Sequence, residues 1–559
     1  MKSKKCTSVV VMSLFAVLAM PVGMAAQDNP SQNPKPKHHQ YKLIDLGTFG
    51  GPDSAVGGFG TFLNNPGTVV GGADTSIPDP YSPNCFDPEC FVQHASQWKN
   101  GVLTDLGALP GVNSSYAGGI SANGFIAGLS QNGVIDPLLG VPEGQAVLWR
   151  SGNIINLGNL GGNESFANNV NNRGQVVGPA ANAIPDPYSM FGWGTQTRAF
   201  LWKNGVMQDL GTLGGPDAAA FFVNNRGQVA GQAYTNSTPN PVTGVPTTDP
   251  FLWESGVMRD LGTLGGTLSF TNGLNDRGQV VGQSNLSGDL VFHPFLWDRG
   301  VITDLGTFGG DTGFATVVNE KGDVIGRADV PGSKTHHGFL WRDGVLTDLG
   351  VLRSDACSTG WAINQTGQIV GSAGITPGGC NGPGHGFLWE NGGPLVDLNS
   401  LVAPGSGLEM TESVGINDRG EISGIGVVAN GDVHAFLLIP CDEKHPGHCQ
   451  DYSMILRRPA RRQRYRRAAN RQREQTIRFA TGSGEAIIFP ANQRRRAISK
   501  VPPKQSQLGW GILRILAGAE LLVGVPPPLR RMNLPQVLIG DSALGKPESP
   551  LTKQRWRRT

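Results

Sequence analysis

The chain has 559 residues, with 81 Gly, 39 Pro and only 16% charged residues. Long apolar helical patterns are missing, and short β-type runs separated by Gly, Asn and Asp recur, which excludes a mainly helical protein and indicates an all-β fold with many tight turns. The net charge of +2 averages an acidic region (27–440, 18 Lys and Arg against 35 Asp and Glu) and a basic one (441–559, 24 against 8).

The first 26 residues have the pattern of a secretory signal peptide. Three lysines precede an apolar run (9–22), and small residues follow, so we expect cleavage near Ala25 or Ala26. A membrane anchor is the alternative, but the run is short for a span and contains a proline. We predict an exported protein, extracellular or periplasmic, with no transmembrane segment in the mature chain. A polar, Pro-rich linker (27–40) follows.

Residues 41–440 repeat one sequence pattern eight times. A copy contains Phe-Leu-Trp, Asp-Leu-Gly and Asn-x-x-Gly steps, each beside a short strand pattern. The Asp-Leu-Gly step begins at Asp45, Asp105, Asn156, Asp209, Asp260, Asp304, Asp348 and Asp397. A unit of this size cannot bury its own apolar face, so the units must stack on one another. Four short strands per unit are typical of a propeller blade.

The two ends of the repeat region favour a closed ring. The first strand pattern (41–46) has the character of a unit's second strand, and the last (434–438) that of a first strand. If they pair, with Leu43 beside Leu437, the ring closes and leaves only short, protected edges. We therefore predict an all-β, closed β-propeller of eight four-stranded blades, with seven blades as the alternative.

The repeated motifs resemble a known bacterial family. His-Ala-Phe-Leu-Trp, Asp-Leu-Gly-Thr-Leu-Gly-Gly and Ile-Asn-x-x-Gly-Gln-Val-Val-Gly are similar to the HAF-repeat family of probable extracellular repeat proteins, over residues 41 to about 440. The resemblance implies an exported, propeller-like protein. It implies no activity and no catalytic residues.

The repeated polar residues have structural explanations. Calcium needs several oxygens from one tight loop, whereas each repeated Asp stands alone in its unit, so we expect it to close a turn by accepting backbone N–H bonds. A second repeated position holds His94, Gln145, Arg198, Asp249, His293, His337, His385 and His434. Metal ligands must converge on one point, and these belong to different units, so we expect hydrogen-bonding roles. We predict no metal and no cofactor.

Symmetry breaks at the connection before each Phe-Leu-Trp strand, which is much longer in the first four units. Insertions at one repeat position emerge on one face, and loops on a rigid scaffold often bind ligands. Two of these loops share Ile-Pro-Asp-Pro-Tyr-Ser. The candidate binding residues are Asp79, Tyr81, Asp186, Tyr188 and Trp193. The alternative is that the aromatic side chains turn inward and pin their own loops.

Six of the seven cysteines follow the signal segment and fall into local pairs, which are Cys85 with Cys90, Cys357 with Cys380, and Cys441 with Cys449. Outside the cytoplasm such pairs predict disulfides. A zinc site is the alternative, but C-x-x-C spacing is absent.

The tail (441–559) is rich in Arg and Pro and lacks periodicity. Its arginine runs resemble nucleic-acid-binding arms, but an exported protein rarely meets nucleic acid, so we predict disorder and no nucleic-acid partner. A shift of reading frame after about Tyr452 is a further explanation.

No G-x-S-x-G, H-E-x-x-H or P-loop sequence occurs in the chain. We therefore favour a non-catalytic, monomeric module that uses loops on one propeller face to bind an extracellular glycan or a surface protein. The alternatives are a secreted polysaccharide hydrolase or lyase acting at the channel mouth, and a purely structural envelope component.

Overall fold

The computed structural model describes residues 39–441, except residues 59, 354, 375–379 and 381–383. The predicted signal peptide, nearly all of the linker, and the tail beyond Cys441 lie outside the described residues. Within them, strands account for the regular structure apart from one short 3-10 helix, η1 (Leu398–Ser400). The predicted all-β fold is confirmed.

The strands of the described residues form six four-stranded sheets and one eight-stranded sheet. The eight-stranded sheet holds two antiparallel sets of four strands, β14–β17 and β18–β21, joined through a parallel pairing at Thr248 and Leu268. We call each antiparallel set of four a quartet, and its strands inner, second, third and outer.

The quartets are numbered along the chain. Quartets one to four are β2 (Gly50–Ala55), β3 (Val69–Pro78), β4 (Phe91–Lys99), β5 (Val102–Asp105); β6 (Ser115–Ile120), β7 (Ile126–Ile135), β8 (Pro142–Arg150), β9 (Asn153–Gly158); β10 (Asn169–Val170), β11 (Val176–Pro185), β12 (Thr195–Lys203), β13 (Val206–Asp209); and β14 (Ala218–Val223), β15 (Val229–Pro239), β16 (Pro246–Glu254), β17 (Val257–Asp260). Quartets five to eight are β18 (Gly265–Leu274), β19 (Val280–Leu286), β20 (Phe292–Asp298), β21 (Val301–Asp304); β22 (Gly313–Val318), β23 (Val324–Asp329), β24 (His336–Arg342), β25 (Val345–Asp348); β26 (Cys357–Ile363), β27 (Ile369–Gly374), β28 (Gly384–Trp389), β29 (Val396–Asp397); and β30 (Leu408–Ile416), β31 (Ile422–Val428), β32 (Val433–Pro440), β1 (Tyr41–Asp45).

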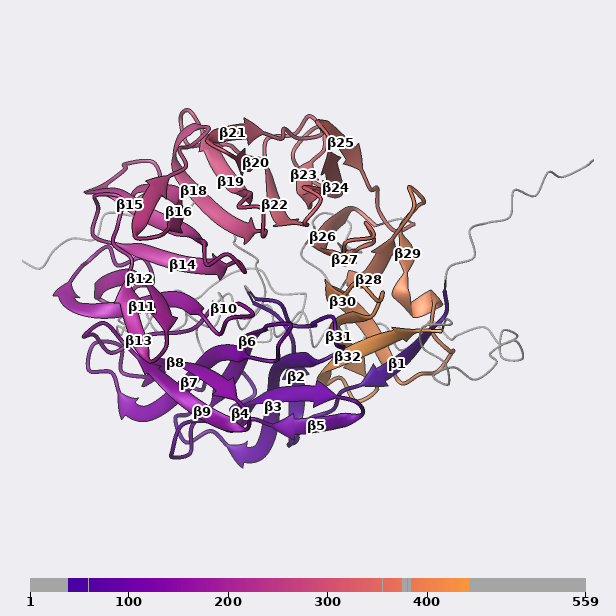
Figure 1. Ribbon diagram of the computed structural model, residues 1–559. Helices are drawn as coiled ribbons and strands as arrows, with labels where there is room; N and C mark the ends of the chain where they lie inside the picture. Colours follow the sequence, from indigo (N-terminus) through magenta and orange to yellow (C-terminus); the bar gives the residue numbers. More distant parts are fainter. Residues whose placement is uncertain (1–38, 59, 354, 375–379, 381–383, 442–559) are drawn as a thin grey trace, which may run out of the picture.

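The quartets lie around a common centre in chain order (Figure 1). Inner strands such as β14, β22 and β26 lie near the centre, and outer strands such as β5, β21 and β25 lie at the periphery. Each quartet joins the second half of one sequence repeat to the first half of the next, so a sheet does not start at Phe-Leu-Trp as the repeat pattern suggested. The arrangement is a β-propeller-like, all-β fold.

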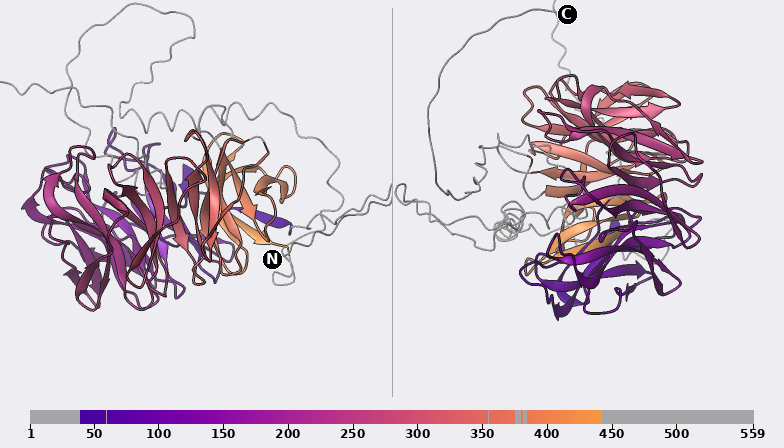
Figure 2. Two further views of the ribbon diagram at one scale, coloured as in Figure 1. Left: turned by 90° about the horizontal axis from the view of Figure 1, so that it is seen from above. Right: turned by 90° about the vertical axis from the view of Figure 1, so that its left-hand side faces the viewer.

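The meander within a quartet gives the molecule two different faces (Figure 2). The turns from inner to second strand and from third to outer strand lie on one face, the turn face. The hairpins from second to third strand, and the connections to the next inner strand, lie on the opposite face, the loop face. These directions follow from the antiparallel pairing of every neighbouring strand in a quartet.

On the turn face, the repeated Asn side chains link neighbouring quartets. Each Oδ1 accepts backbone N–H bonds within its own turn, and Nδ2 donates to a carbonyl in the next turn. The inter-quartet bonds are Asn64 to Ser121, Asn171 to Asn224, Asn224 to Asn275, Asn275 to Asn319, Asn319 to Asn364, Asn364 to Asn417 and Asn417 to Asn64, with N···O distances of 2.9–3.4 Å. Quartet two lacks the Asn, and Asn123 Nδ2 there donates to the Asn172 carbonyl instead.

Between the faces, one Gly of the Gln-Val-Val-Gly step allows close approach of two strands. A Cβ at this position would lie 1.8–2.1 Å from a carbonyl oxygen of the inner strand, so only Gly fits. The positions are Gly71, Gly128, Gly178, Gly231, Gly282, Gly326, Gly371 and Gly424. In six quartets a fully buried Phe of the third strand fills the space between sheets. The repeated Trp residues are buried or partly buried in the same clusters, as predicted.

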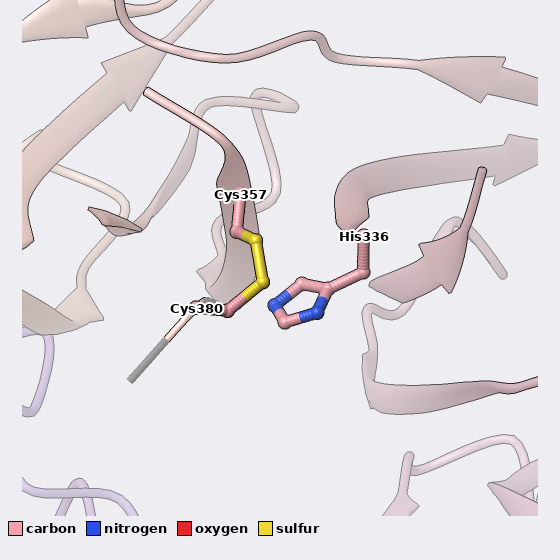
Figure 3. Close-up of side chains that lie close together, drawn as sticks. All are labelled: His336, Cys357 and Cys380. Atoms are coloured by element: carbon pink, nitrogen blue, oxygen red, sulfur yellow. A yellow bond between two sulfur atoms is a disulfide. The ribbon is translucent and has the colours of Figure 1, made fainter. Parts of the chain in front are cut away.

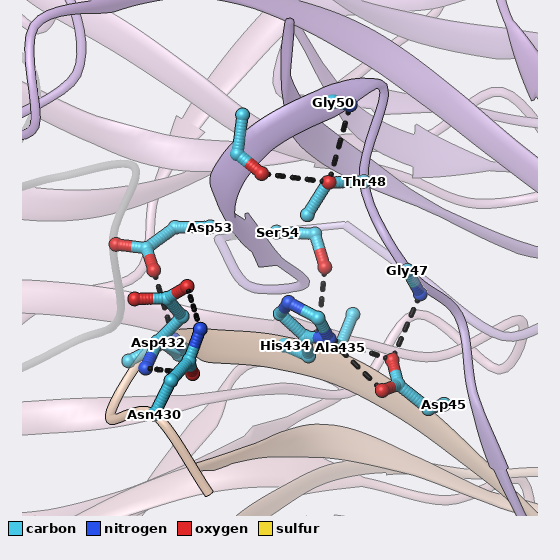
Figure 4. Close-up of polar contacts among 12 residues, drawn as sticks. Asp45, Gly47, Thr48, Gly50, Asp53, Ser54, Asn430, Asp432, His434 and Ala435 are labelled. Atoms are coloured by element: carbon cyan, nitrogen blue, oxygen red, sulfur yellow. Dashed lines mark hydrogen bonds and ion pairs between the residues drawn. The ribbon is translucent and has the colours of Figure 1, made fainter. Parts of the chain in front are cut away.

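The first and last described strands pair. β1 lies antiparallel to β32, with Leu43 opposite Leu438 and Ile44 opposite Leu437, one residue from the predicted register. Nearby, the Val433 N–H donates to Asp53 (2.8 Å) and the Ala435 N–H donates to Ser54 Oγ (3.0 Å) (Figure 4). Segments more than 350 residues apart therefore lie side by side.

Candidate functional site

The loop face is elaborated in quartets one to four, as the sequence predicted. The second strands β3, β7, β11 and β15 have 10, 10, 10 and 11 residues, whereas β19, β23, β27 and β31 have 6 or 7. The insertions are thus built largely as strand extensions, each with a register shift before the tip. The sequence predicts loops here, because prolines at the tips interrupt the strand pattern.

Each of the four long hairpins has the same type of tip. An Asp or Asn precedes a Pro, and its Oδ1 accepts the N–H two residues further on, as in an Asx turn. The pairs are Asp79 with Tyr81 (2.9 Å), Asp136 with Leu138 (2.6 Å), Asp186 with Tyr188 (2.8 Å) and Asn240 with Val242 (2.7 Å). Sequence reasoning found two of these tips; the Asx-Pro pair shared by all four is the signal that it missed.

The five predicted binding residues occupy different depths. Tyr188 is 46% exposed, and Tyr81 is half-buried. Asp79 and Asp186 are buried, and their carboxyl groups hold the hairpin tips through backbone N–H bonds. Trp193 is 1% exposed. Direct contact with a ligand therefore stays a prediction for the two tyrosines, whereas the three buried side chains build the hairpins.

Trp193 belongs to an aromatic cluster beneath the hairpins. Its ring stacks on Phe191 (centroids 5.1 Å apart), and Phe166 packs edge-on against both rings. Phe86 of the first hairpin and Phe221 of quartet four belong to the same cluster. Aromatic clusters of this kind add packing energy beyond the buried area and fix the rings in place. The hairpins of successive quartets therefore stand on a shared apolar base.

Two buried carboxyl pairs lie where the long hairpins meet the next quartet. Glu164 faces Asp136, and Asp217 faces Asp186. Glu164 Oε1 and Asp186 Oδ2 meet no hydrogen-bond donor among the described residues. Burial, reinforced by the facing carboxyl, raises the pKa of Glu164 to about 8 and that of Asp217 to about 7. Each pair can share a proton between two quartets at neutral pH.

A third group of acids lies in the first hairpin. Burial and the charge of Asp87 raise the pKa of Asp74 to about 8, and burial raises the pKa of Asp87 to about 7. The Gln93 amide contacts both carboxyls, at 3.4 and 3.0 Å. The loop face therefore carries carboxyl groups whose pKa lies near neutrality, and such groups can take up and release protons under physiological conditions.

The repeated Asp and His residues have the structural roles that were predicted. The Asp or Asn of every Asp-Leu-Gly step accepts the N–H two residues ahead, as between Gly47 and Asp45 (2.9 Å). In five quartets its carboxyl also bonds the repeated His, and in another it bonds Arg198. In quartet four Asp249 replaces His; burial, and then the charge of Asp260, raises the Asp249 pKa to about 7.

Two predicted disulfides are formed, Cys85–Cys90 and Cys357–Cys380. Cys441 is also disulfide-bonded, and its predicted partner Cys449 lies outside the described residues.

His336 lies beside the Cys357–Cys380 disulfide, so one imidazole and two sulfur atoms meet within 4.8 Å (Figure 3). The sulfur atoms are bonded to each other and present no thiolates. Arg327 approaches His336 Nε2 at 3.2 Å, and burial, followed by the charges of Arg327 and His337, lowers the His336 pKa to about 3. The neutral imidazole therefore packs against the disulfide.

Among the described residues, no helix has the length and apolar content needed to cross a membrane.

No protein-family model matches the chain, and no curated protein matches it. Solved structures with a related shape include the acylaminoacyl peptidase of Pyrococcus horikoshii (TM-score 0.36, 10% identity, 64% of this chain and 54% of that chain). The β-propeller domain of the Trilobed protease from Pyrococcus furiosus gives a TM-score of 0.36 and 9% identity, over 65% of this chain and 97% of that chain. Dipeptidyl peptidase 4 of Porphyromonas gingivalis gives a TM-score of 0.38 and 10% identity, over 60% of this chain and 53% of that chain. The chain thus spans about half the length of the first peptidase.

Proposed function

We propose that residues 41–440 form a closed eight-bladed propeller of the HAF-repeat type, in an exported protein whose loop face binds an extracellular glycan or surface protein without catalysis. One observation carries this proposal: the hairpins of quartets one to four are long, stand on a shared aromatic base and present exposed apolar side chains at their tips. Exposed apolar side chains on a rigid scaffold are typical of binding surfaces.

Closure is supported by two contacts between the ends of the repeat region. All five residues of β1 pair with β32, and Asn417 joins the turn of the last quartet to Asn64 in the first (3.1 Å). Eight blades correspond to the eight quartets of the described residues. The three disulfide-bonded sites support export, because disulfides persist in oxidising compartments.

The test is to screen the full-length protein against extracellular glycans and surface proteins and to assay turnover of every glycan that binds. We expect binding without product. Tyr188→Ala should weaken binding at least 10-fold, whereas Val206→Ala should leave it unchanged, because Val206 is exposed on an outer strand away from the loop face. Equal binding by both variants would contradict the loop face as the binding surface.

A secreted polysaccharide hydrolase or lyase is the second candidate. The near-neutral pKa values of Glu164 and Asp217 favour it, since general acids work best when their pKa lies near the working pH. Glycan cleavage that persists through purification and disappears in Glu164→Gln would establish the enzyme and refute the non-catalytic proposal.

A further inference from the structure

The exposed large apolar side chains of the described residues fall into two sets. One set repeats, with one Val at the start of the outer strand in five quartets: Val102, Val206, Val257, Val301 and Val345. The other lies on the loop face of quartets one to five: Ile77, Val112, Val134, Ile135, Leu138, Ile184, Tyr188, Val242 and Leu290, with exposures of 46–76%. The second set has no counterpart among the described residues of quartets six to eight, so it does not follow from the framework that all quartets share.

These loop-face residues belong to one continuous surface, because each hairpin touches the next. The Tyr81 hydroxyl approaches Gly133, and the Leu138 side chain approaches Gly194. The Tyr234 hydroxyl donates to the Tyr188 carbonyl (3.2 Å). Asn240 Nδ2 donates to Asp289 Oδ2 (3.3 Å) and so links the fourth hairpin to the fifth.

The same surface is strongly acidic in sequence. Its segments are 45–54, 74–94, 105–115, 130–145, 156–165, 181–198, 209–218, 233–249, 260–269 and 284–293, and together they contain 16 Asp and Glu but a single Lys or Arg, Arg198. Six of these acids (Asp74, Asp79, Asp136, Glu164, Asp186 and Asp217) are buried, so the charge that a partner meets comes from the ten that are exposed or half-buried. Arg198 is bonded to Asp209 (2.9 Å). Clustered charge of one sign attracts a partner of the opposite sign and speeds its association.

We propose that this loop surface binds a cationic polypeptide segment that carries apolar side chains and belongs to another molecule. The inference rests on the proposed function and narrows its partner to a polypeptide. Lys or Arg side chains would meet the exposed and half-buried carboxylates, and aliphatic side chains would pack on residues such as Ile135 and Leu290.

Two other occupants fit less well. The exposed apolar set is aliphatic except for Tyr188, whereas the face of a sugar ring packs best on a flat aromatic ring. The chain's own tail (442–559) is basic, but it begins after Cys441, which follows β32 on the turn face, opposite to the loop surface.

The test measures fluorescence anisotropy of labelled peptides with full-length protein. The probe is a 20-residue peptide of alternating Lys and Leu; Lys/Ser and Glu/Leu peptides of equal length are controls. We expect the Lys/Leu peptide to bind at least 10-fold more tightly than either control and to weaken about 10-fold between 50 and 300 mM NaCl, because salt screens the charges.

Matched variants locate the site. Ile135→Ser with Leu290→Ser (47% and 76% exposed) should weaken Lys/Leu binding at least 10-fold, whereas Val206→Ser with Val301→Ser, which changes exposed outer-strand residues (65% and 63%), should not. Equal loss in both variants, or equal binding of the Lys/Ser control, would overturn the inference.

Two further outcomes separate this inference from the proposed function. In the first outcome, a neutral oligosaccharide binds, Tyr188→Ala weakens that binding, and the Lys/Leu peptide does not bind. This result would overturn the polypeptide partner and leave the loop surface in place as the binding surface. Carbodiimide cross-links from tail lysines such as Lys500 to Glu89 or Glu143 in the free protein would show that the tail occupies the surface, and would also overturn it.

Discussion

The turn face and the loop face of the same sheets follow opposite rules. On the turn face the same Asn side chain makes the same three kinds of bond in quartet after quartet. On the loop face no two hairpins carry the same set of exposed side chains, although four share an Asx-Pro tip. The molecule thus separates a framework that must be uniform from a surface that is free to vary.

The contrast has a physical cause. Each turn bonds to the turn of the next quartet, so a change at one turn affects two sheets, and quartet two, which lacks the Asn, makes this bond through Asn123 instead. A hairpin tip beyond the sheet stack needs only to satisfy its own backbone, which an Asx turn does locally. Four substitutions can test this division, from the largest expected effect to the smallest.

Gly282→Val should have the largest effect on the framework. Its Cβ would lie 1.8 Å from the Phe270 carbonyl oxygen, so the strands must separate. We expect a loss of about 3 kcal/mol or more in the free energy of unfolding, measured with urea. Gly360→Ala is the control, because its Cβ would meet its nearest atom at 3.4 Å, and it should cost less than about 1 kcal/mol. Similar losses for the two variants would refute the close-approach argument.

Asn417→Ala tests whether the turn-face bonds form a complete circle. The change removes the bond to Asn64 and the turn bonds of its own quartet, and we expect a loss of about 1–3 kcal/mol. Asn275→Ala, which breaks the equivalent bond to Asn319 inside the series, should cost the same in urea unfolding. If Asn417→Ala loses less free energy of unfolding than Asn275→Ala, by about 1 kcal/mol or more, the ring is open.

Glu164→Gln should change the pH dependence of stability through the loop face. The folded pKa of Glu164 is about 8, above its ordinary value of 4.5, because of burial first and then the nearby Asp136 and Glu143. Folding therefore favours the protonated acid, and its contribution is complete below pH 4.5 and is lost as the pH rises toward 8. In urea unfolding, the free energy of unfolding of the native protein should fall by about 1 kcal/mol or more from pH 5 to pH 8. The fall should be smaller in the variant. An unchanged fall in Glu164→Gln would contradict this assignment.

Asp45→Asn should have the smallest effect. The hydrogen bond that Asp45 accepts from His434 raises the His434 pKa. Burial acts to raise the Asp45 pKa, but the bonds that Asp45 accepts from His434 and Gly47 outweigh it and lower that pKa. The pair therefore stabilises most between pH 3.8 and 6.5, weakening as pH falls below that window or rises through the His434 pKa. An exposed pair of this kind is worth about 0.2–1 kcal/mol. NMR titration of His434 should show its pKa return toward 6.5 in the variant; no change would exclude the pairing.

The sequence predicted the framework well, because each framework contact is repeated. The Asp of Asp-Leu-Gly was assigned to its turn, the Phe-Leu-Trp strands to the core, and two cysteine pairs to disulfides, from residue type and spacing alone. The sequence does not show at which strand each sheet begins, because a repeated pattern can be divided into units at any point. Only strand pairing shows that β14 and β16 share a sheet.

The candidate site was predicted in place but not in detail. Loop length located the elaborated face, and the shared Ile-Pro-Asp-Pro-Tyr motif pointed to the tips. The sequence could not tell that Trp193 turns inward while Tyr188 faces solvent, because both are aromatic residues in polar, Pro-rich segments.

By itself, the sequence determined a stack of similar β units whose apolar strands and turn residues recur at fixed intervals, because local pattern and repetition require no knowledge of distant contacts. Only the tertiary structure decided which acids face one another across quartets, as Glu164 and Asp136 do, and which apolar tips join into one surface. Those features arise where separate repeats meet, and their meeting depends on how all the sheets are arranged in space.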